Sequence, residues 1–253
     1  MREFWTSWDR WKLKPEQAQV DEAKRKAALE AVKHVKNGFV VGLGSGSTAA
    51  YAIEAIGDKI RSENLKVAGI PTSTQAFMLA VKHRIPITTL DEHPTVDVDI
   101  DGVDQVDKDL NLIKGMGGAL AREKIVAAAS RLNVIIADAG KRVRVLGENN
   151  HPVPMEVLPF AVKLVQQRIE SLGGKPVLRE GKGKLGPVIT DNGNMIFDAV
   201  FGEINDVAGL ETRSKMIPGV VETGLFVNLA DIVYLGSSSN VETLKRKGKR
   251  SLN

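Results

Sequence analysis

Short apolar runs alternate with amphipathic helical patterns along the first 140 residues, and no other feature of the sequence constrains the fold as much. The helical patterns repeat apolar residues every three or four positions, whereas apolar runs of a few residues are typical of buried strands. This alternation predicts an α/β fold: a mostly parallel, Rossmann-like sheet with helices on both faces, and ligands at the carboxyl ends of its strands. We expect helices over 20–35, 48–61, 73–83 and 119–129, and strands over 39–41, 66–70, 87–89, 96–100 and 133–137.

The pattern changes after Gly147, where short strands are separated by glycine-rich turns. We expect strands over 153–158, 176–179, 188–191 and 195–199, helices over 159–172 and 204–217, and a strand over 232–235 that returns to the first sheet. A smaller α+β domain with a ferredoxin-like fold is therefore predicted as an insertion over 151–224. The α/β domain then comprises 19–150 and 225–253, preceded by an N-terminal arm over 1–18.

The arm contains all three tryptophans of the chain. Trp5, Trp8 and Trp11 are spaced by three residues, which places them on one face of a short helix. This face suits either the protein's own surface or a neighbouring subunit, and the sequence does not separate the two.

Composition excludes several classes of protein. The chain has no cysteine, so disulfides, thiolate metal sites and a cysteine nucleophile are excluded. No apolar run approaches the roughly 18 residues of a membrane helix, and we expect a soluble, cytoplasmic protein without a membrane partner. The net charge of +4 lies largely in the tail over 245–250 and in the first helix, and aromatics make up only 5% of the chain. We therefore expect no nucleic-acid partner, because a basic stripe interleaved with stacking aromatics is missing.

A glycine- and serine-rich turn, Gly42–Thr48, lies between a predicted strand and a predicted helix. Its glycines allow a tight turn, while its hydroxyls and the first helical amides offer hydrogen-bond donors to an anion such as phosphate. Because it matches neither the nucleotide P-loop nor G-x-G-x-x-G, binding of ATP or NAD is disfavoured, although the turn also suits a simple tight connection. Lys24 and Lys141 are candidate partners of the same phosphate.

Two carboxylates, Asp101 and Asp104, follow the next strand and flank a glycine, so that both can accept hydrogen bonds from sugar hydroxyls in one cleft. Together with Asp107 and Asp109 they also form an acidic cluster, for which a magnesium site and a plain acidic turn are alternatives. The spacing does not match an EF-hand and no histidine is close in sequence, so we expect no metal site.

The segment Lys114–Lys124 places a lysine before a glycine-rich turn that opens a helix. A cation and free backbone amides in this position can stabilise an oxyanion, and Glu123 lies one turn into the helix, where it can act as a base. Taken alone, Glu123 and Lys124 are more typical of an exposed pair of charges on a helix surface.

These three segments, in this order and together with 137–143 and 218–226, closely resemble the ribose-5-phosphate isomerase A family, and the likeness spans about residues 22–240. The resemblance implies an enzyme without cofactor or metal, a homodimer or homotetramer, that interconverts ribose 5-phosphate and ribulose 5-phosphate in the non-oxidative pentose phosphate pathway. It implies that Glu123 is the proton acceptor and that Lys141 and Lys24 lie near the phosphate. Substrate binding is implied for Ser45, Gly46, Ser47 and Thr48, for Asp101, Gly102, Val103 and Asp104, and for Lys114, Gly115, Met116 and Gly117, with catalytic roles for Glu123, Asp101, Asp104 and Lys114.

From the resemblance we expect Glu123 to transfer a proton between C2 and C1 of the sugar through a cis-enediolate that Lys114 and the amides of 115–118 stabilise. Two other functions share this type of architecture or pocket. One is an amino-sugar phosphate isomerase or a CoA transferase, the latter with a covalent glutamate. The other is a sugar-phosphate sensor without turnover, which the joint presence of Glu123 and Lys114 disfavours.

Overall fold

A computed structural model describes residues 15–248 except 182 and 184. The predicted arm with Trp5, Trp8 and Trp11 lies outside these residues, apart from its last four positions, which already belong to the first helix.

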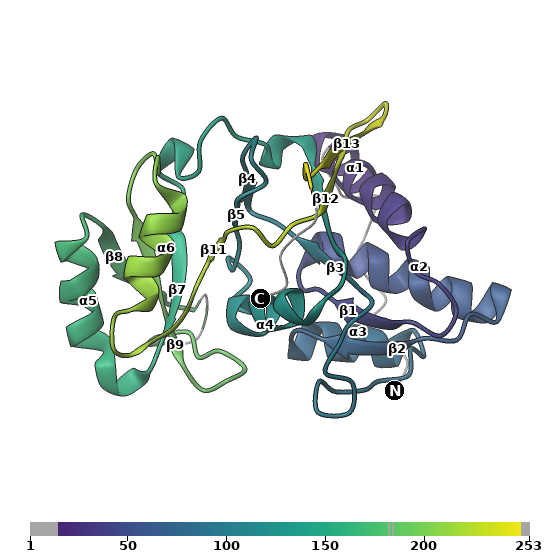
Figure 1. Ribbon diagram of the computed structural model, residues 1–253, viewed down its shortest axis with the longest axis horizontal. Coiled ribbons are helices and arrows are strands. Elements are labelled where there is room, and N and C mark those ends of the chain that lie inside the picture. Colours follow the sequence, from purple (N-terminus) through teal and green to yellow (C-terminus); the bar gives the residue numbers. More distant parts are fainter. Residues whose placement is uncertain (1–14, 182, 184, 249–253) are drawn as a thin grey trace.

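The main sheet has six strands in the order β13-β12-β6-β3-β1-β2, all parallel except the edge strand β13 (Figure 1). This confirms the predicted α/β fold, including the return of the chain to the first sheet after the second half. Its strands are β1 (Val40–Leu43), β2 (Ala68–Pro71), β3 (Val98–Gly102), β6 (Asn133–Asp138), β12 (Ile232–Gly236) and β13 (Val241–Lys245).

Helices cover both faces of this sheet. One face carries α1 (Pro15–Val32), α2 (Ser47–Glu63) and α3 (Thr74–Lys82), whose apolar side chains share a core with Val41, Leu43 and Val98. The other face carries α4 (Leu120–Ala129), which contributes Val126 and Ala127 to smaller cores.

Alternation along β3 places two aspartates on the α4 face. Val98 and Ile100 point into the core beneath α1 and α2, so Asp99 and Asp101 point to the opposite side, since successive side chains of a strand alternate. Gly42 in β1 makes room for Asp99, because a Cβ atom at this position would lie only 2.4 Å from Asp99 Oδ1. The polar end of β3 therefore faces the N-terminal part of α4.

A three-stranded antiparallel sheet stands beside the carboxyl end of β3. It consists of β4 (Gln105–Val106), β5 (Leu112–Ile113) and β11 (Leu225–Phe226), which are too short to give a periodic signal in the sequence. Lys114 follows β5 directly, and its N–H donates to the carbonyl of Gly224 at 2.9 Å. This small sheet therefore fixes the backbone from which Lys114 projects.

The second main sheet is antiparallel, in the order β10-β7-β9-β8. With α5 (Val162–Ser171) and α6 (Val207–Lys215) it follows the chain order strand, helix, strand, strand, helix, strand, which is the ferredoxin-like arrangement that we predicted. Both helices pack into one core with the strands, and in Figure 1 this unit stands apart from the main sheet. Its strands are β7 (Val153–Val157), β8 (Lys175–Leu178), β9 (Met195–Val200) and β10 (Val220–Thr223).

Two predicted strands are wrong. The segment 87–89 makes only an isolated bridge from Ile87 to Gly69, because Pro86 has no N–H to extend a ladder. The segment 188–191 is not a strand either, since Thr190 donates to the carbonyl of Asn194 in a tight turn. Within the part of the chain that the structure describes, no helix has both the length and the apolar character to cross a bilayer.

Candidate active site

The turn between β1 and α2 is tied to two neighbouring strands. Gly46 adopts φ +95°, a conformation that favours glycine, and opens α2. The N–H of Ser45 donates to Asp101 Oδ1 at 3.0 Å, and its hydroxyl lies 2.8 Å from Thr72 Oγ1 and 2.6 Å from Ser73 Oγ. The predicted Gly42–Thr48 turn is thus held next to the carboxyl end of β3.

Donors for an anion remain open at the start of α2. The N–H groups of Ser47 and Thr48 donate to no other described residue, as expected in the first turn of a helix. Lys24 on α1 approaches this end with Nζ 3.3 Å from Ser47 Oγ and 3.8 Å from Asp21. Lys141 lies in the short 3-10 helix Ala139–Lys141 after β6, at the same edge of the sheet.

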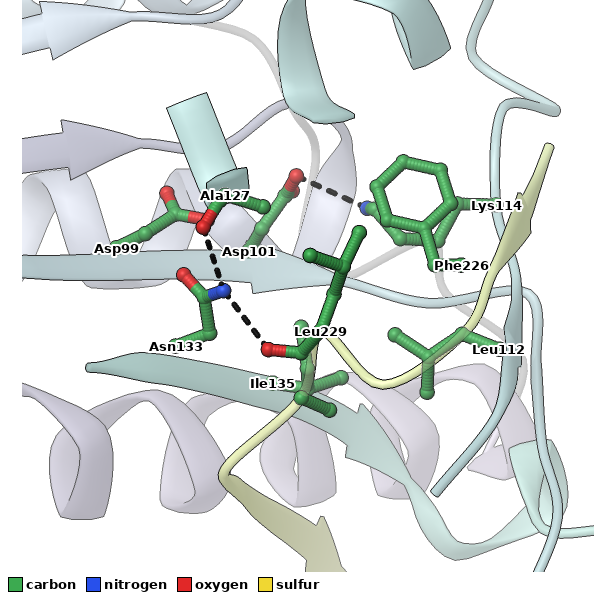
Figure 2. Close-up of a pocket in the computed structure, with 10 residues that line it drawn as sticks. Asp99, Asp101, Leu112, Lys114, Ala127, Asn133, Ile135, Phe226 and Leu229 are labelled. Carbon is green, nitrogen blue, oxygen red and sulfur yellow. Dashed lines mark hydrogen bonds and ion pairs between the residues drawn. The ribbon is translucent and has the colours of Figure 1, made fainter. Parts of the chain in front are cut away.

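A buried cluster of three charged side chains lies at the carboxyl end of β3. Lys114 Nζ is 2.9 Å from Asp101 Oδ2 and 3.2 Å from Glu123 Oε2, and it donates to the carbonyl of Gly102 at 2.5 Å. The three side chains are at most 5% exposed. Figure 2 shows the Lys114 ammonium directed toward Asp101, with the ring of Phe226 beside it. Lys114 Nζ lies 5.4 Å from the centroid of this ring. The structure thus brings together Asp101, Lys114 and Glu123 from three separate elements.

The cluster shifts the protonation of its members. Burial, followed by the negative charge of Asp101, raises the pKa of Glu123 to about 8, although Lys114 acts in the opposite direction. Burial acts to lower the pKa of Lys114, but the attraction of Asp101 and Glu123 outweighs it and raises this pKa above its usual range. Lys114 is therefore a permanent cation, and Glu123 can exchange a proton near neutral pH.

The glycine-rich turn 115–118 forms one wall beside this cluster. Gly115 and Gly118 have φ of +105° and +81°, and a Cβ atom on Gly115 would lie 2.8 Å from Leu120. The N–H of Met116 donates to Asp104 Oδ2 at 3.0 Å. Asp104 therefore anchors the turn, and the predicted residues Asp101–Asp104 and Lys114–Gly117 lie side by side.

A cavity of about 170 Å³ adjoins the turn and continues to the Gly42–Thr48 turn. Ser45, Ser73 and Gln75 line it at the edge of the main sheet, and Gly117–Ala119 line it from the turn before α4. The second sheet's loop contributes Val188–Asp191.

Glu123 and Lys124 do not form an exposed helical pair, so this alternative from the sequence is wrong. Both are buried and face different partners. Lys124 Nζ lies 2.9 Å from Glu211 on α6 and 2.9 Å from Glu222 on β10, which links α4 to the second sheet.

The acidic cluster predicted as an alternative metal site does not converge. Asp107 accepts hydrogen bonds from the N–H groups of Asp109 and Asn111, as in a tight turn, whereas Asp101 faces Lys114. Among the described residues no three His, Asp or Glu side chains are arranged to hold a metal ion.

Thr72, Ser73, Gln75 and Phe226 contact the site but were not predicted from the sequence. The hydroxyls of the first two bond to Ser45, and Gln75 accepts from the N–H of Gly46 at 2.8 Å. Their position directly after β2, at the edge where Ser45 follows β1, is a signal that could have identified them. Phe226 gives no local signal, since only the fold brings it to Lys114.

Comparisons with known proteins agree with this architecture. A family model described as ribose 5-phosphate isomerase A (phosphoriboisomerase A) matches residues 68–240, which include Asp101, Lys114 and Glu123. The ribose-5-phosphate isomerase A of Archaeoglobus fulgidus is 51% identical over 224 residues, which cover 87% of this chain and 98% of that protein.

Two solved structures are similar over nearly their whole length. The ribose 5-phosphate isomerase A of Methanocaldococcus jannaschii superposes with a TM-score of 0.86 at 48% identity, covering 89% of this chain and 99% of that one. A D-ribose-5-phosphate isomerase in complex with phospho-erythronic acid gives a TM-score of 0.87 at 44% identity, covering 90% and 99%.

Proposed function

The chain belongs to the ribose 5-phosphate isomerase A family, and from this premise we propose how its side chains interconvert D-ribose 5-phosphate and D-ribulose 5-phosphate. The protein is an aldose–ketose isomerase of these pentose phosphates, which places it in the pentose phosphate pathway. The reaction moves hydrogen between C1 and C2 and leaves the composition of the sugar unchanged.

Glu123 acts as the base in this proposal. It removes the proton from C2 of the open-chain aldose, which leaves a cis-enediolate, and returns the proton to C1, while the hydroxyl proton passes from O2 to O1. Lys114 and the amides of the 115–118 turn stabilise the negative charge that develops on these oxygens.

The contact between Glu123 and Lys114 supports this assignment most directly. A carboxyl group on a side chain that is 5% exposed, 3.2 Å from a fixed cation and with its pKa raised to about 8, is a stronger base than an ordinary glutamate. It can also return the proton it has taken, because a pKa near the working pH suits both steps.

The two aspartates have different proposed roles. Asp101 accepts from the N–H groups of Ser45 and Gly102 with one oxygen and holds Lys114 with the other, so its role is to position that lysine. Asp104 Oδ2 accepts a hydrogen bond from the N–H of Met116. Its other oxygen is proposed to accept a hydrogen bond from a sugar hydroxyl during ring opening or proton exchange.

The phosphate is proposed to bind at the start of α2. The amides of Ser47 and Thr48 and the ammonium of Lys24 offer donors there, and Lys141 is proposed to approach from the neighbouring strand end. We also propose that residues 151–224 form an inserted domain, that the chain assembles as a homodimer or homotetramer, and that it works in the cytoplasm.

An isomerisation assay after treatment with EDTA tests substrate, reaction and metal independence together. We expect ribose 5-phosphate to be converted into ribulose 5-phosphate at an unchanged rate after the chelator is removed. No conversion before the treatment would refute the function, whereas a loss that added Mg²⁺ or Mn²⁺ restores would refute metal independence alone.

A further inference from the structure

Arg179 extends from the end of β8, on the second sheet, to the glycine-rich turn beside the buried cluster. Its Nη1 donates to the carbonyl of Gly115 at 3.0 Å and to that of Met116 at 3.1 Å. The other side of the guanidinium is paired with Asp198 on β9, at 2.8 Å from Nε and 2.5 Å from Nη2. The side chains of Arg179 and Asp198 are 12% and 21% exposed. Their largely buried salt bridge therefore links the second sheet to the turn.

These contacts fix two consecutive peptide planes. In a trans peptide the C=O of one residue and the N–H of the next point in opposite directions, and the described chain has no cis peptide bond. In the first plane, Arg179 holds the carbonyl of Gly115 while Asp104 holds the N–H of Met116, so both sides are bound.

The second plane is held on one side only. Arg179 binds the carbonyl of Met116, so the N–H of Gly117 points away from the guanidinium. That N–H donates to no other described residue, and Gly117 lines the cavity that also contains Ser45 and Ala119. An open amide beside a cavity, aligned by a fixed carbonyl, is the arrangement of an oxyanion donor.

We propose that Arg179 is a positioning residue for the isomerisation, because it aligns the Gly117 amide with an oxygen of the enediolate. This inference rests on the proposed function of the site. Arginine suits the role, since its planar group binds a carboxylate with one edge and two carbonyls with another, which a lysine ammonium cannot reproduce. The second sheet would then contribute to catalysis without touching the substrate.

Kinetics of Arg179→Met and Arg179→Lys with ribose 5-phosphate test the proposal. Removing an oxyanion donor typically reduces kcat by about 10² to 10³, so a misaligned donor in Arg179→Met is expected to lower kcat by about 10- to 100-fold. KM should change by less than about threefold, and Arg179→Lys should recover part of the loss. The pH midpoint of kcat/KM should stay unchanged, because the contacts of Glu123 are intact.

Inhibition by phospho-erythronic acid gives a second readout. Its carboxylate carries a negative charge that can lie where the charged oxygen of the enediolate forms, so its inhibition constant should rise roughly in parallel with the loss of kcat. A variant that loses only thermal stability, with kcat and inhibition unchanged, would overturn the proposal.

Arg122→Met is the matched control. Arg122 also links α4 to the second sheet's loop, through Asn192 at 2.7 Å and the carbonyl of Asp191 at 2.8 Å, but no bond joins it to the turn 115–118. Its kcat should stay within about threefold. Equal losses of kcat in Arg122→Met and Arg179→Met, or a change in KM alone in Arg179→Met, would mean that Arg179 serves only domain packing and would refute the inference. Failure of the unaltered chain to convert ribose 5-phosphate would instead refute the proposed function.

Discussion

Two lysines lie over the ring of Phe226, and each is paired with two carboxylates. Lys114 is 5.4 Å from the ring centroid and contacts Asp101 and Glu123, whereas Lys124 is 4.9 Å away and contacts Glu211 and Glu222. The first cluster belongs to the candidate site, while the second joins α4 to α6 and β10. Similar charges in neighbouring places thus have different partners and link different elements.

The pKa values of the glutamates in the two clusters are shifted in opposite directions, upward for Glu123 and downward for Glu222. Burial raises the pKa of Glu123, which also faces Asp101 and whose only cationic partner among the described residues is Lys114. Burial also acts to raise the pKa of Glu222, but attraction by Lys124, together with hydrogen bonds from Thr223 and Lys215, outweighs it and lowers this pKa. A carboxylate with several donors stays ionised as part of a structural ion pair, whereas a buried one with a single cation becomes a group that exchanges protons.

Replacement of Glu123 should give the largest loss of kcat, and replacement of Glu222 in the second cluster should leave kcat almost unchanged. Glu123→Gln keeps the shape of the side chain but cannot accept a proton, so kcat should fall by about 10² to 10⁴. Steady-state kinetics with ribose 5-phosphate measure this loss, and circular dichroism checks the fold. Glu222→Gln is the matched control, with an expected kcat within about threefold. Wild-type turnover in Glu123→Gln would assign the proton transfer to another residue.

Replacement of Lys114 should have the next largest effect. Lys114→Met removes the cation beside the enediolate and leaves Asp101 and Glu123 without compensation, so kcat should fall by about 10² and the pKa of Glu123 should rise further. The rate measured at pH 7 and again at pH 9 separates the loss of the cation from the rise in the pKa of Glu123. Only the part of the rate that is lost because Glu123 is protonated is recovered at the higher pH. Full activity at both pH values would contradict the role of Lys114.

The sequence predicted the location of the candidate site residues in the fold better than their contacts. Strand–helix alternation placed the turn Gly42–Thr48 and the pair Asp101 and Asp104 at one sheet edge, since strand ends in a parallel sheet meet there. The opposite environments of Glu123 and Lys124 could not be predicted, because neighbouring helical residues differ in direction by about 100° and only the placement of α4 between two sheets buries both.

The contact of Arg179 with the turn 115–118 could not be predicted from local sequence patterns either. Arg179 and Asp198 lie more than sixty residues from the turn that Arg179 holds, and neither belongs to a motif with its own chemistry. The helix and strand pattern of the second half predicted a ferredoxin-like domain but no strand order, since it included a strand over 188–191 that does not form and left out β10. The short strands β4, β5 and β11 have too few residues for a period to be recognised.

The pH dependence of the unaltered chain should show the shifted pKa of Glu123. With Lys114, Asp101 and Asp104 as its charged neighbours, Glu123 must be ionised to act as a base, so kcat/KM should rise about tenfold per pH unit up to pH 7 and level off above about pH 8. Stability should change in the opposite sense. The folded chain keeps a proton that the unfolded chain releases above its ordinary pKa of 4.5, so the free energy of unfolding should fall as the pH rises from 4.5 to about 8.

Glu123→Gln is the control for both profiles. Its free energy of unfolding, measured by denaturant titration, should lose the part of the pH dependence that Glu123 contributes. A kcat/KM midpoint near 4.5 in the unaltered chain would mean that Glu123 is not shifted and would remove the distinction between the two clusters.

Replacement of Lys124 should have the smallest effect on catalysis and a clear effect on stability. Lys124→Met leaves Glu211 and Glu222 without their common cation, although Lys215 still lies 2.9 Å from Glu222. Removing one partner of a largely buried ion pair costs about 3 kcal/mol, so the free energy of unfolding should fall by about this amount while kcat stays within about threefold. Denaturant titration and kinetics at saturating substrate measure the two quantities on the same preparation. Because Lys114 and Lys124 share the Phe226 ring, a kcat loss in Lys124→Met as large as that in Lys114→Met would mean that the ring couples the clusters into a single functional unit.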